Sequence, residues 1–260
     1  MRLRLTSTLA ACLLALAGCG ASTTGTVSSS ATAPGQLSGT ITVFAASSLK
    51  ESFTAIGAAF EAANPGTKVV FDFGASSTLA TQITQKAPAD VFAAASQKTM
   101  DTVTGAGAAT GDKVFAVNTM EIATPPKPTM PVTSLADLAK PGVKVAVCQK
   151  DVPCGAAAVK LFDQNKLSVT PVTEEVDVKS VLSKVVLGEV DAGVVYVTDV
   201  KAAKDTVVGV EIPKDQNVTT KYPIAPITAS ANPALAKAFV DYVLSAAGQG
   251  ALTAAGFASP

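Results

Sequence analysis

Short β-like runs alternate with helical patterns along most of the chain. A strand pattern at residues 41–46 precedes a helical pattern at 49–63, and a strand pattern at 68–73 precedes a helical one at 78–85. The alternation continues further along, with a buried strand at residues 192–196. Such alternation favours doubly wound α/β sheets, in which ligands bind beyond the carboxyl ends of the strands.

Two proline-bearing segments, at residues 123–125 and 221–223, divide this pattern, and the part between them has βα units of its own. The simplest architecture is two doubly wound α/β lobes joined by two crossover strands, with a ligand cleft between the lobes. We expect residues 40–122 and 224–260 to form lobe 1, and residues 123–223 to form lobe 2.

The first 18 residues have the pattern of a secretory signal peptide, with Arg2 and Arg4 before a short apolar run. The run ends in Leu-Ala-Gly-Cys19, which matches a bacterial lipobox, whose cysteine becomes lipidated. A plain signal peptide with an incidental cysteine is the alternative. Residues 19–39 are rich in small and polar residues and predict a flexible tether. We therefore expect an exported protein, lipid-anchored at Cys19 on the outer face of the cell membrane.

Composition excludes several kinds of chemistry. Removal of the signal leaves 260 − 18 = 242 residues, with 20 acidic residues against 18 lysines, so the formal charge is −2. The chain has no histidine, and its only arginines are Arg2 and Arg4. Histidine-dependent catalysis, common zinc sites and a guanidinium clamp are therefore excluded. No basic run suggests nucleic acid as a partner, and we expect neither a cofactor nor enzymatic activity.

Two cysteines remain in the mature chain, Cys148 and Cys154, six positions apart. In an exported protein, such a pair is expected to form a disulfide. Two buried thiols are an alternative, and a metal site is a weaker one because no histidine could complete it.

Two strand-to-helix junctions carry exposed hydroxyls, at residues 44–48 and 73–78. A helix N-terminus has unpaired backbone N–H groups and a partial positive charge, and a serine there adds an O–H donor. Two such ends facing each other would form an anion site without a charged residue. Donors alone suit a fully deprotonated dianion, because a protonated oxyanion also needs an acceptor for its proton.

Several segments, in this order, resemble the molybdate-binding proteins of bacterial ABC importers, the ModA family, which has the type II periplasmic binding-protein fold. The segments are residues 41–49, 75–83, 87–92, 152–155, 176–178, 193–196 and 256–257. The resemblance extends over residues 40 to 259. It implies a solute-binding protein that captures molybdate, held as an oxyanion through hydrogen bonds, for a permease and its ATPase.

The resemblance also implies the ligand-binding residues. Ser48 and Ser76 would each give a backbone N–H and a hydroxyl, Cys154 and Val178 a backbone N–H, and Tyr196 a phenol. Relatives often have alanine at the position of Cys154, which leaves a backbone contact unaffected.

Each of these residues also has an ordinary structural interpretation. Serines at helix starts are commonly N-caps, and a lone tyrosine such as Tyr196 is commonly part of the core. Relatives often have alanine at Ser47, so Ser47 and Ser48 could exchange roles.

Three functions remain to be compared. The first is a receptor for molybdate, and for tungstate, whose dianion is almost the same size; we expect it to be a monomer. The second is a related receptor for another oxyanion or a small organic ligand. The third is a lipid-anchored hydrolase with a serine nucleophile and a lysine base, although no lysine shares a motif with Ser48 or Ser76.

Overall fold

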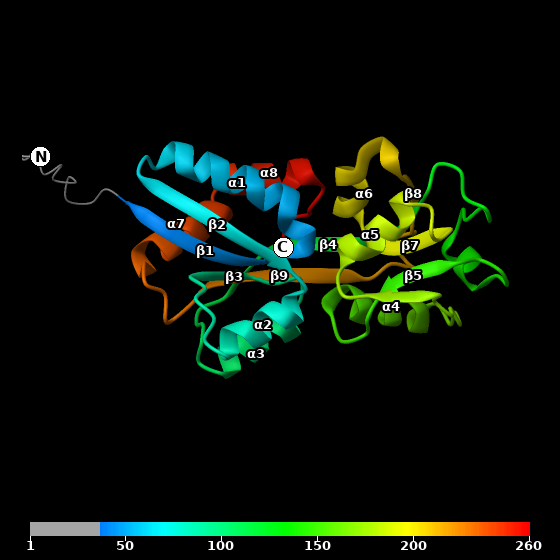
Figure 1. Cartoon of the computed structure of the whole chain (residues 1–260), viewed down its shortest axis with the longest axis horizontal. Coiled ribbons are helices and arrows are strands. Elements are labelled where there is room, and N and C mark those ends of the chain that lie inside the picture. The colour runs from blue at the N-terminus through cyan, green and yellow to red at the C-terminus, as the bar shows by residue number, and fades with distance from the viewer. Residues whose placement is uncertain (1–36) are drawn as a thin grey trace, which may run out of the picture. The chain divides into compact units, whose positions relative to one another are not determined.

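The computed structural model describes residues 37–260 of the chain (Figure 1). The strands are β1 (Gly39–Ala46), β2 (Thr67–Gly74), β3 (Val91–Ala93), β4 (Lys113–Thr124), β5 (Val145–Cys148), β6 (Thr173–Glu175), β7 (Ala192–Tyr196), β8 (Val208–Glu211) and β9 (Thr219–Pro226). The α-helices are α1 (Lys50–Ala63), α2 (Ser76–Thr84), α3 (Gln97–Gly105), α4 (Pro153–Gln164), α5 (Val178–Val186), α6 (Val197–Ala203), α7 (Pro233–Leu244) and α8 (Ala246–Ala255). Short 3₁₀ helices are η1 (Ser47–Leu49), η2 (Leu135–Ala139) and η3 (Lys204–Thr206). The predicted signal peptide, the predicted lipidation site Cys19 and all but the last residues of the predicted tether lie outside this described part.

The strands follow one another in the order β2-β1-β3-β9-β4-β7-β5-β6, with β8 also paired to β4. β1 pairs in parallel with β2 and β3, and β5 pairs in parallel with β6 and β7. β4 pairs antiparallel with β9 through its first part and with β7 and β8 through its last part. This strand therefore belongs to both halves of the fold, which we call the first lobe (β1–β3, β9, α1–α3, α7 and α8) and the second lobe (β5–β8 and α4–α6).

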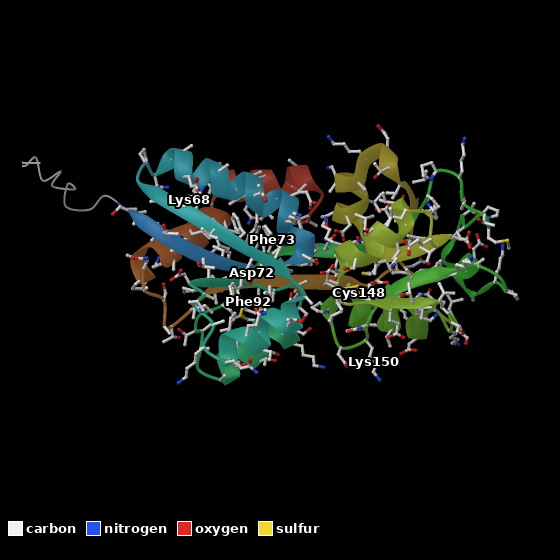
Figure 2. The ribbon with its side chains drawn as sticks, viewed as in Figure 1. Lys68, Asp72, Phe73, Phe92, Cys148 and Lys150 are labelled. Atoms are coloured by element: carbon white, nitrogen blue, oxygen red, sulfur yellow. A yellow bond between two sulfur atoms is a disulfide. The ribbon has the colours of Figure 1, made fainter. Side chains whose placement is uncertain are left out.

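Helices cover both faces of the first-lobe sheet, as the alternation along β1 requires. Ile41 and Val43 belong to the buried cluster that includes α1, α7 and α8, whereas Phe44 belongs to the cluster that includes α2 and α3. Phe92 on β3 joins the latter cluster, and Phe73 on β2 packs against the former (Figure 2). The carboxyl end of β1 continues into η1, and the carboxyl end of β2 reaches α2 after one residue, Ala75.

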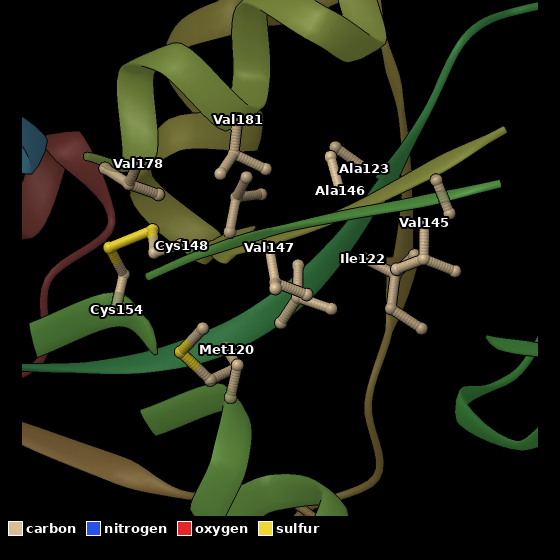
Figure 3. Packing of buried hydrophobic residues seen from close by; sticks show 14 of the residues in the cluster. Met120, Ile122, Ala123, Val145, Ala146, Val147, Cys148, Cys154, Val178 and Val181 are labelled. Atoms are coloured by element: carbon tan, nitrogen blue, oxygen red, sulfur yellow. A yellow bond between two sulfur atoms is a disulfide. The ribbon is translucent and has the colours of Figure 1, made fainter. Parts of the chain in front are cut away.

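The core of the second lobe is built mainly from small aliphatic side chains (Figure 3). All four residues of β5 are buried, as expected for a parallel strand covered on both faces. Val178 and Val181 of α5 pack in the same cluster, which also holds Cys148 and Cys154. The C-terminal end of β5 and the N-terminal end of α5 therefore pack in one core. This packing fixes the loop that follows β5 and the loop that precedes α5.

The predicted fold class, two α/β lobes with helices on both sides of their sheets, is confirmed, but some elements were missed. The sequence predicts a break at residues 221–223, yet these residues lie in β9, between β3 and β4. A register irregularity between Val114 and Ala116 of β4 lies opposite Pro223, and such irregularities are where a sheet tolerates proline. Helix α2 begins at Ser76 rather than at residue 78. The predicted lobe boundaries stay a prediction.

Within residues 37–260, the helices are too short or too polar for any of them to cross a bilayer.

Candidate functional site

A small cavity lies where the N-terminal ends of several helices from both lobes meet. Its interior volume is about 10 Å³, which is of the order needed to admit one water molecule. It is lined by Ala46, Ser47, Ser48, Gly74, Ala75, Ser76, Ala95, Val152, Pro153, Cys154, Asp177, Val178 and Tyr196.

The first-lobe wall presents two serines at helix starts. Ser48 is the second residue of η1, which follows β1, and Ser76 is the first residue of α2, which begins after one further residue beyond β2. Both are buried, with 4% and 1% of their surface exposed. The Ser76 Oγ accepts a hydrogen bond from the Ala95 N–H at 3.0 Å, and the Ser48 Oγ lies 2.9 Å from the Tyr222 hydroxyl. The serine hydroxyls are therefore held by the protein itself.

The second-lobe wall presents the first turns of two helices. Cys154 is the second residue of α4, after Pro153 at the first position, and Val178 is the first residue of α5. The first backbone hydrogen bond of α4 is donated by the Ala156 N–H to the carbonyl of Val152, the residue just before the helix. The N–H groups that precede this bond have no acceptor within the helix, as at any helix start. They give this wall its hydrogen-bond donors and its partial positive charge.

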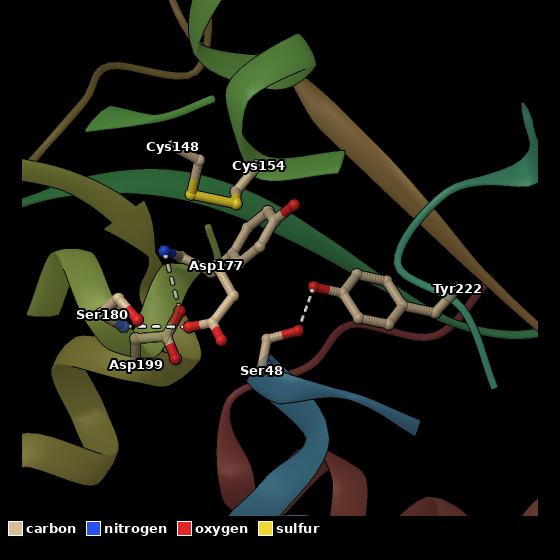
Figure 4. The surroundings of a disulfide bond; sticks show 8 residues. Ser48, Cys148, Cys154, Asp177, Ser180, Asp199 and Tyr222 are labelled. Carbon is tan, nitrogen blue, oxygen red and sulfur yellow. Dashed lines mark hydrogen bonds between the residues drawn. A yellow bond between two sulfur atoms is a disulfide. The ribbon is translucent and has the colours of Figure 1, made fainter. Parts of the chain in front are cut away.

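Asp177 caps α5 and is the charged residue among those that line the cavity. Its Oδ1 accepts a hydrogen bond from the Ser180 N–H at 2.9 Å (Figure 4). The carboxylate is thereby engaged with the helix start that it caps, which stabilises the first turn of α5 and leaves the Val178 N–H unpaired by the cap.

Tyr196 closes the cavity from the end of β7. Its side chain is 1% exposed, and its hydroxyl has no hydrogen-bond partner among the described residues. Burial, followed by the proximity of Tyr222 and Asp199, raises the pKa of Tyr196 well above its ordinary value. The phenol therefore keeps its proton at neutral pH. A buried hydroxyl without a partner normally costs stability. A ligand that accepts a hydrogen bond from the Tyr196 hydroxyl would remove that cost.

A disulfide joins Cys148, at the end of β5, to Cys154 in the first turn of α4 (Figure 4). The predicted pairing is thus present. Gly155 follows it, and a Cβ at this position would lie 1.9 Å from the Gln149 carbonyl oxygen. The loop between β5 and α4 folds so closely over the helix start that only glycine fits. Disulfide and glycine together fix the position of the Cys154 N–H.

The lysine nearest to this wall in sequence is already paired. Lys179 Nζ lies 3.0 Å from Asp199 Oδ1 and 2.8 Å from Glu51 Oε2. Burial works against its charge, yet the carboxylates of Asp199 and Glu51 raise its pKa overall. Asp199 is fully buried, and burial raises its pKa against the opposing effect of Lys179. These ion pairs connect α5 and α6 with α1, and hence the second lobe with the first.

The arrangement offers neutral hydrogen-bond donors from both lobes. Side-chain hydroxyls, backbone N–H groups and helix N-termini can bind an anion that only accepts hydrogen bonds. No cationic side chain lines the cavity. The described residues also contain no group of three or more cysteine, aspartate or glutamate side chains placed to hold a metal ion.

The five residues predicted as ligands all line this cavity: Ser48, Ser76, Cys154, Val178 and Tyr196. Ser47 lines it too, so the choice between Ser47 and Ser48 for the hydroxyl contact stays open. Sequence reasoning missed Tyr222 and Ala95, which bind the two serine hydroxyls. Neither belongs to a ligand motif. A strand assignment for residues 219–226 would have pointed to Tyr222.

Two α/β lobes around a cavity that is rich in hydrogen-bond donors and has no cationic side chain are the features of a receptor for a small solute. Residues 41–258 match the family described as bacterial extracellular solute-binding protein. The molybdate-binding protein ModA of Mycobacterium tuberculosis is 45% identical over 233 residues, which cover 89% of each chain. The ModA of Escherichia coli is 33% identical over 217 residues, covering 79% of this chain and 83% of that one. The periplasmic molybdate-binding protein of Azotobacter vinelandii has the same fold, with a TM-score of 0.76 and 20% identity over 85% of this chain and 99% of that one.

The chain therefore belongs to the ModA family of bacterial extracellular solute-binding proteins. It is a solute-binding component of an ABC importer, which works with a permease and an ATPase, and it is not an enzyme.

Proposed function

We propose that this protein captures molybdate for its importer and binds it in the cavity between η1, α2, α4, α5 and the end of β7. The observation that carries the proposal is the set of uncharged donors that face this cavity from both lobes. The names of its relatives, which are molybdate-binding proteins, support the same solute.

The donor set accounts for the choice of anion. We assign the ligand contacts to the hydroxyls and backbone N–H groups of Ser48 and Ser76, the backbone N–H groups of Cys154 and Val178, and the hydroxyl of Tyr196. Because every group is a donor, a tetrahedral dianion without a proton satisfies all of them, whereas hydrogen phosphate brings a proton that needs an acceptor. Molybdenum is held only as the oxyanion, through hydrogen bonds.

Size then separates one dianion from another. Tungstate has nearly the dimensions of molybdate and is expected to bind nearly as well. Sulfate is smaller and cannot reach every donor at full hydrogen-bond geometry, so its affinity is expected to be lower.

Titration calorimetry at pH 7.5 tests this proposal with molybdate, tungstate, sulfate and phosphate. The expected result is comparable binding of molybdate and tungstate, weaker binding of sulfate and the weakest binding of phosphate. A preference for phosphate, or no binding of molybdate, would contradict the proposal.

We further propose that residues 1–18 are a signal peptide and that Cys19 carries a lipid anchor at the outer face of the membrane, with residues 19–39 as the tether. The lipobox pattern before Cys19 supports this. Replacement of Cys19 by alanine should release the exported protein from the membrane fraction. An unchanged amount of the protein in the membrane fraction would contradict the anchor.

We also propose that the protein is a monomer, which light scattering after size exclusion would test.

A further inference from the structure

The two serines of the first-lobe wall share one feature: a second group of the protein holds each hydroxyl from behind the cavity. For Ser76, that group is the Ala95 N–H, at 3.0 Å from Oγ. An amide N–H can only donate, so Ser76 Oγ is the acceptor and its own proton is left for another partner. Because Ser76 lines the cavity, this proton can be donated to an anion bound there.

For Ser48, the corresponding group is the hydroxyl of Tyr222, at 2.9 Å from Oγ (Figure 4). Either oxygen could donate in this pair. A hydroxyl has one proton. If Ser48 donates it to Tyr222, the cavity loses one donor. If Tyr222 donates to Ser48, the Ser48 proton can bind an anion, in the same way as at Ser76.

We propose that Tyr222 is a positioning residue for anion binding: it donates its O–H to Ser48 Oγ and so directs the Ser48 proton towards the bound oxyanion. The inference rests on the proposed function, because it assumes that Ser48 contacts the anion. Tyr222 itself does not line the cavity, so its hydroxyl acts on the anion through Ser48 and not by direct contact.

The surroundings of Tyr222 suit this role. Its side chain is fully buried on β9, and its ring makes edge contacts with Phe115, Tyr196 and Phe257, at centroid distances of 6.3, 6.0 and 5.2 Å. The ring is therefore fixed from several sides, and its hydroxyl is in place before an anion arrives. Such preorganisation lowers the cost of ordering on binding.

Burial also keeps the tyrosine a donor. It raises the pKa of Tyr222 above its ordinary value, against smaller opposing effects of hydrogen bonding with groups that include Ser48. The phenol is protonated at neutral pH. A hydrogen bond donated by Tyr222 polarises the Ser48 hydroxyl. Consecutive hydrogen bonds, here from Tyr222 to Ser48 and from Ser48 to the anion, strengthen one another.

A double-mutant cycle tests the proposal, with molybdate affinity measured by calorimetry for the unmodified chain, Tyr222→Phe, Ser48→Ala and the double variant. Tyr222→Phe removes one oxygen and keeps the ring. We expect it to weaken binding roughly 3- to 10-fold, as for loss of one hydrogen bond. In the Ser48→Ala background, the same change should have no further effect, because Tyr222 then has nothing to position.

Tyr242→Phe is the matched control. Tyr242 belongs to α7 of the same lobe and packs against Phe60, and it does not line the cavity. The control should bind molybdate as the unmodified chain does.

Equal binding by Tyr222→Phe and the unmodified chain would overturn the inference. So would an equal loss with and without Ser48, since the tyrosine would then act through packing alone. If the unmodified chain does not bind molybdate, the proposed function and this inference both fail, whereas normal binding with uncoupled variants overturns this inference alone.

A crystal structure of the unmodified chain with molybdate tests the same contact without a variant. Tyr222 Oη should stay within about 3 Å of Ser48 Oγ while Ser48 contacts the anion. A Tyr222 hydroxyl that has moved away from Ser48 in that complex would overturn the proposal.

Discussion

The two walls of the cavity supply donors in different ways. The first-lobe wall uses the side chains of Ser48 and Ser76, each held by one hydrogen bond from elsewhere in the same lobe. The second-lobe wall uses mainly backbone N–H groups, held in place by a disulfide at Cys154 and a capping carboxylate at Asp177. Side chains of the first wall can thus be removed one at a time, whereas the second wall, apart from the Tyr196 hydroxyl, can be changed only by moving its backbone.

The largest effect is expected from Gly155→Ala, which moves the backbone of the second wall. The added Cβ would lie 1.9 Å from the Gln149 carbonyl oxygen, so the loop before α4 must shift. Such overpacking costs about 1–3 kcal/mol of folding stability. If the shift also removes the hydrogen bond from the Cys154 N–H to the anion, worth roughly 1.5–3 kcal/mol, calorimetry should show molybdate affinity reduced by up to roughly 100-fold. Gly105→Ala, where nothing lies within 4 Å of the added atom, is the control. Unchanged affinity in Gly155→Ala would show that the second wall does not need this backbone position.

A somewhat smaller effect is expected from Ser76→Ala, which removes one hydroxyl of the first wall and keeps its backbone N–H. A hydrogen bond to a charged group is worth roughly 1.5–3 kcal/mol, so affinity should fall on the order of tenfold or more. Ser77→Ala, one residue further along α2, is the control, because Ser77 does not line the cavity. If calorimetry showed that Ser76→Ala and Ser77→Ala bind molybdate equally tightly, a ligand role for Ser76 would be contradicted.

A few-fold loss is expected when both Cys148 and Cys154 are replaced by alanine. The backbone donor at position 154 remains, but its helix start is no longer tied to the end of β5. By the chain-entropy model, closing so short a loop contributes at most about 2–3 kcal/mol to folding, and the effect on binding arises only from the ordering of the turn. Calorimetry should show weaker binding by a protein whose circular dichroism is unchanged. A fully folded variant that binds as tightly as the parent would argue that the second wall is already rigid without its disulfide.

The smallest effect on binding is expected from pH, although pH should change the stability of the second lobe. Burial, with the nearby Glu211, raises the pKa of Glu121 from 4.5 to about 7. The folded chain then holds more protons than the unfolded one between these values, so its stability falls as pH rises through this window. After discounting for its partial exposure, Glu121→Gln should stabilise the fold by on the order of 1 kcal/mol at pH 8 and by less near pH 4.5.

Denaturant unfolding of the parent and the Glu121→Gln variant at several pH values measures this difference in stability, and a constant difference across the window would contradict it.

Molybdate affinity should stay nearly constant between about pH 6 and 8, because the chain has no histidine and Tyr196 stays protonated. A strong change of affinity in folded protein would indicate a titrating group at the cavity.

The two walls also differ in how far they can be predicted from sequence. The serine at each strand-to-helix junction is visible in the sequence, and so is the Pro-Cys-Gly turn before α4. The groups behind the serines are not visible. Pro223 and Pro226 hide β9, because proline usually excludes a central strand, so Tyr222 could not be placed next to Ser48. The bond from Ala95 to Ser76 depends on the path of a loop and leaves no pattern in the residues themselves.

A structure of the complex with molybdate, in which the anomalous signal of molybdenum locates the anion, tests the central claim most directly. The anion should lie between the two walls, with its oxygens within about 3 Å of the hydroxyls of Ser48, Ser76 and Tyr196 and the backbone N–H groups of Cys154 and Val178. An anion bound elsewhere, or one whose contacts come from lysine side chains or from one lobe alone, would contradict the account.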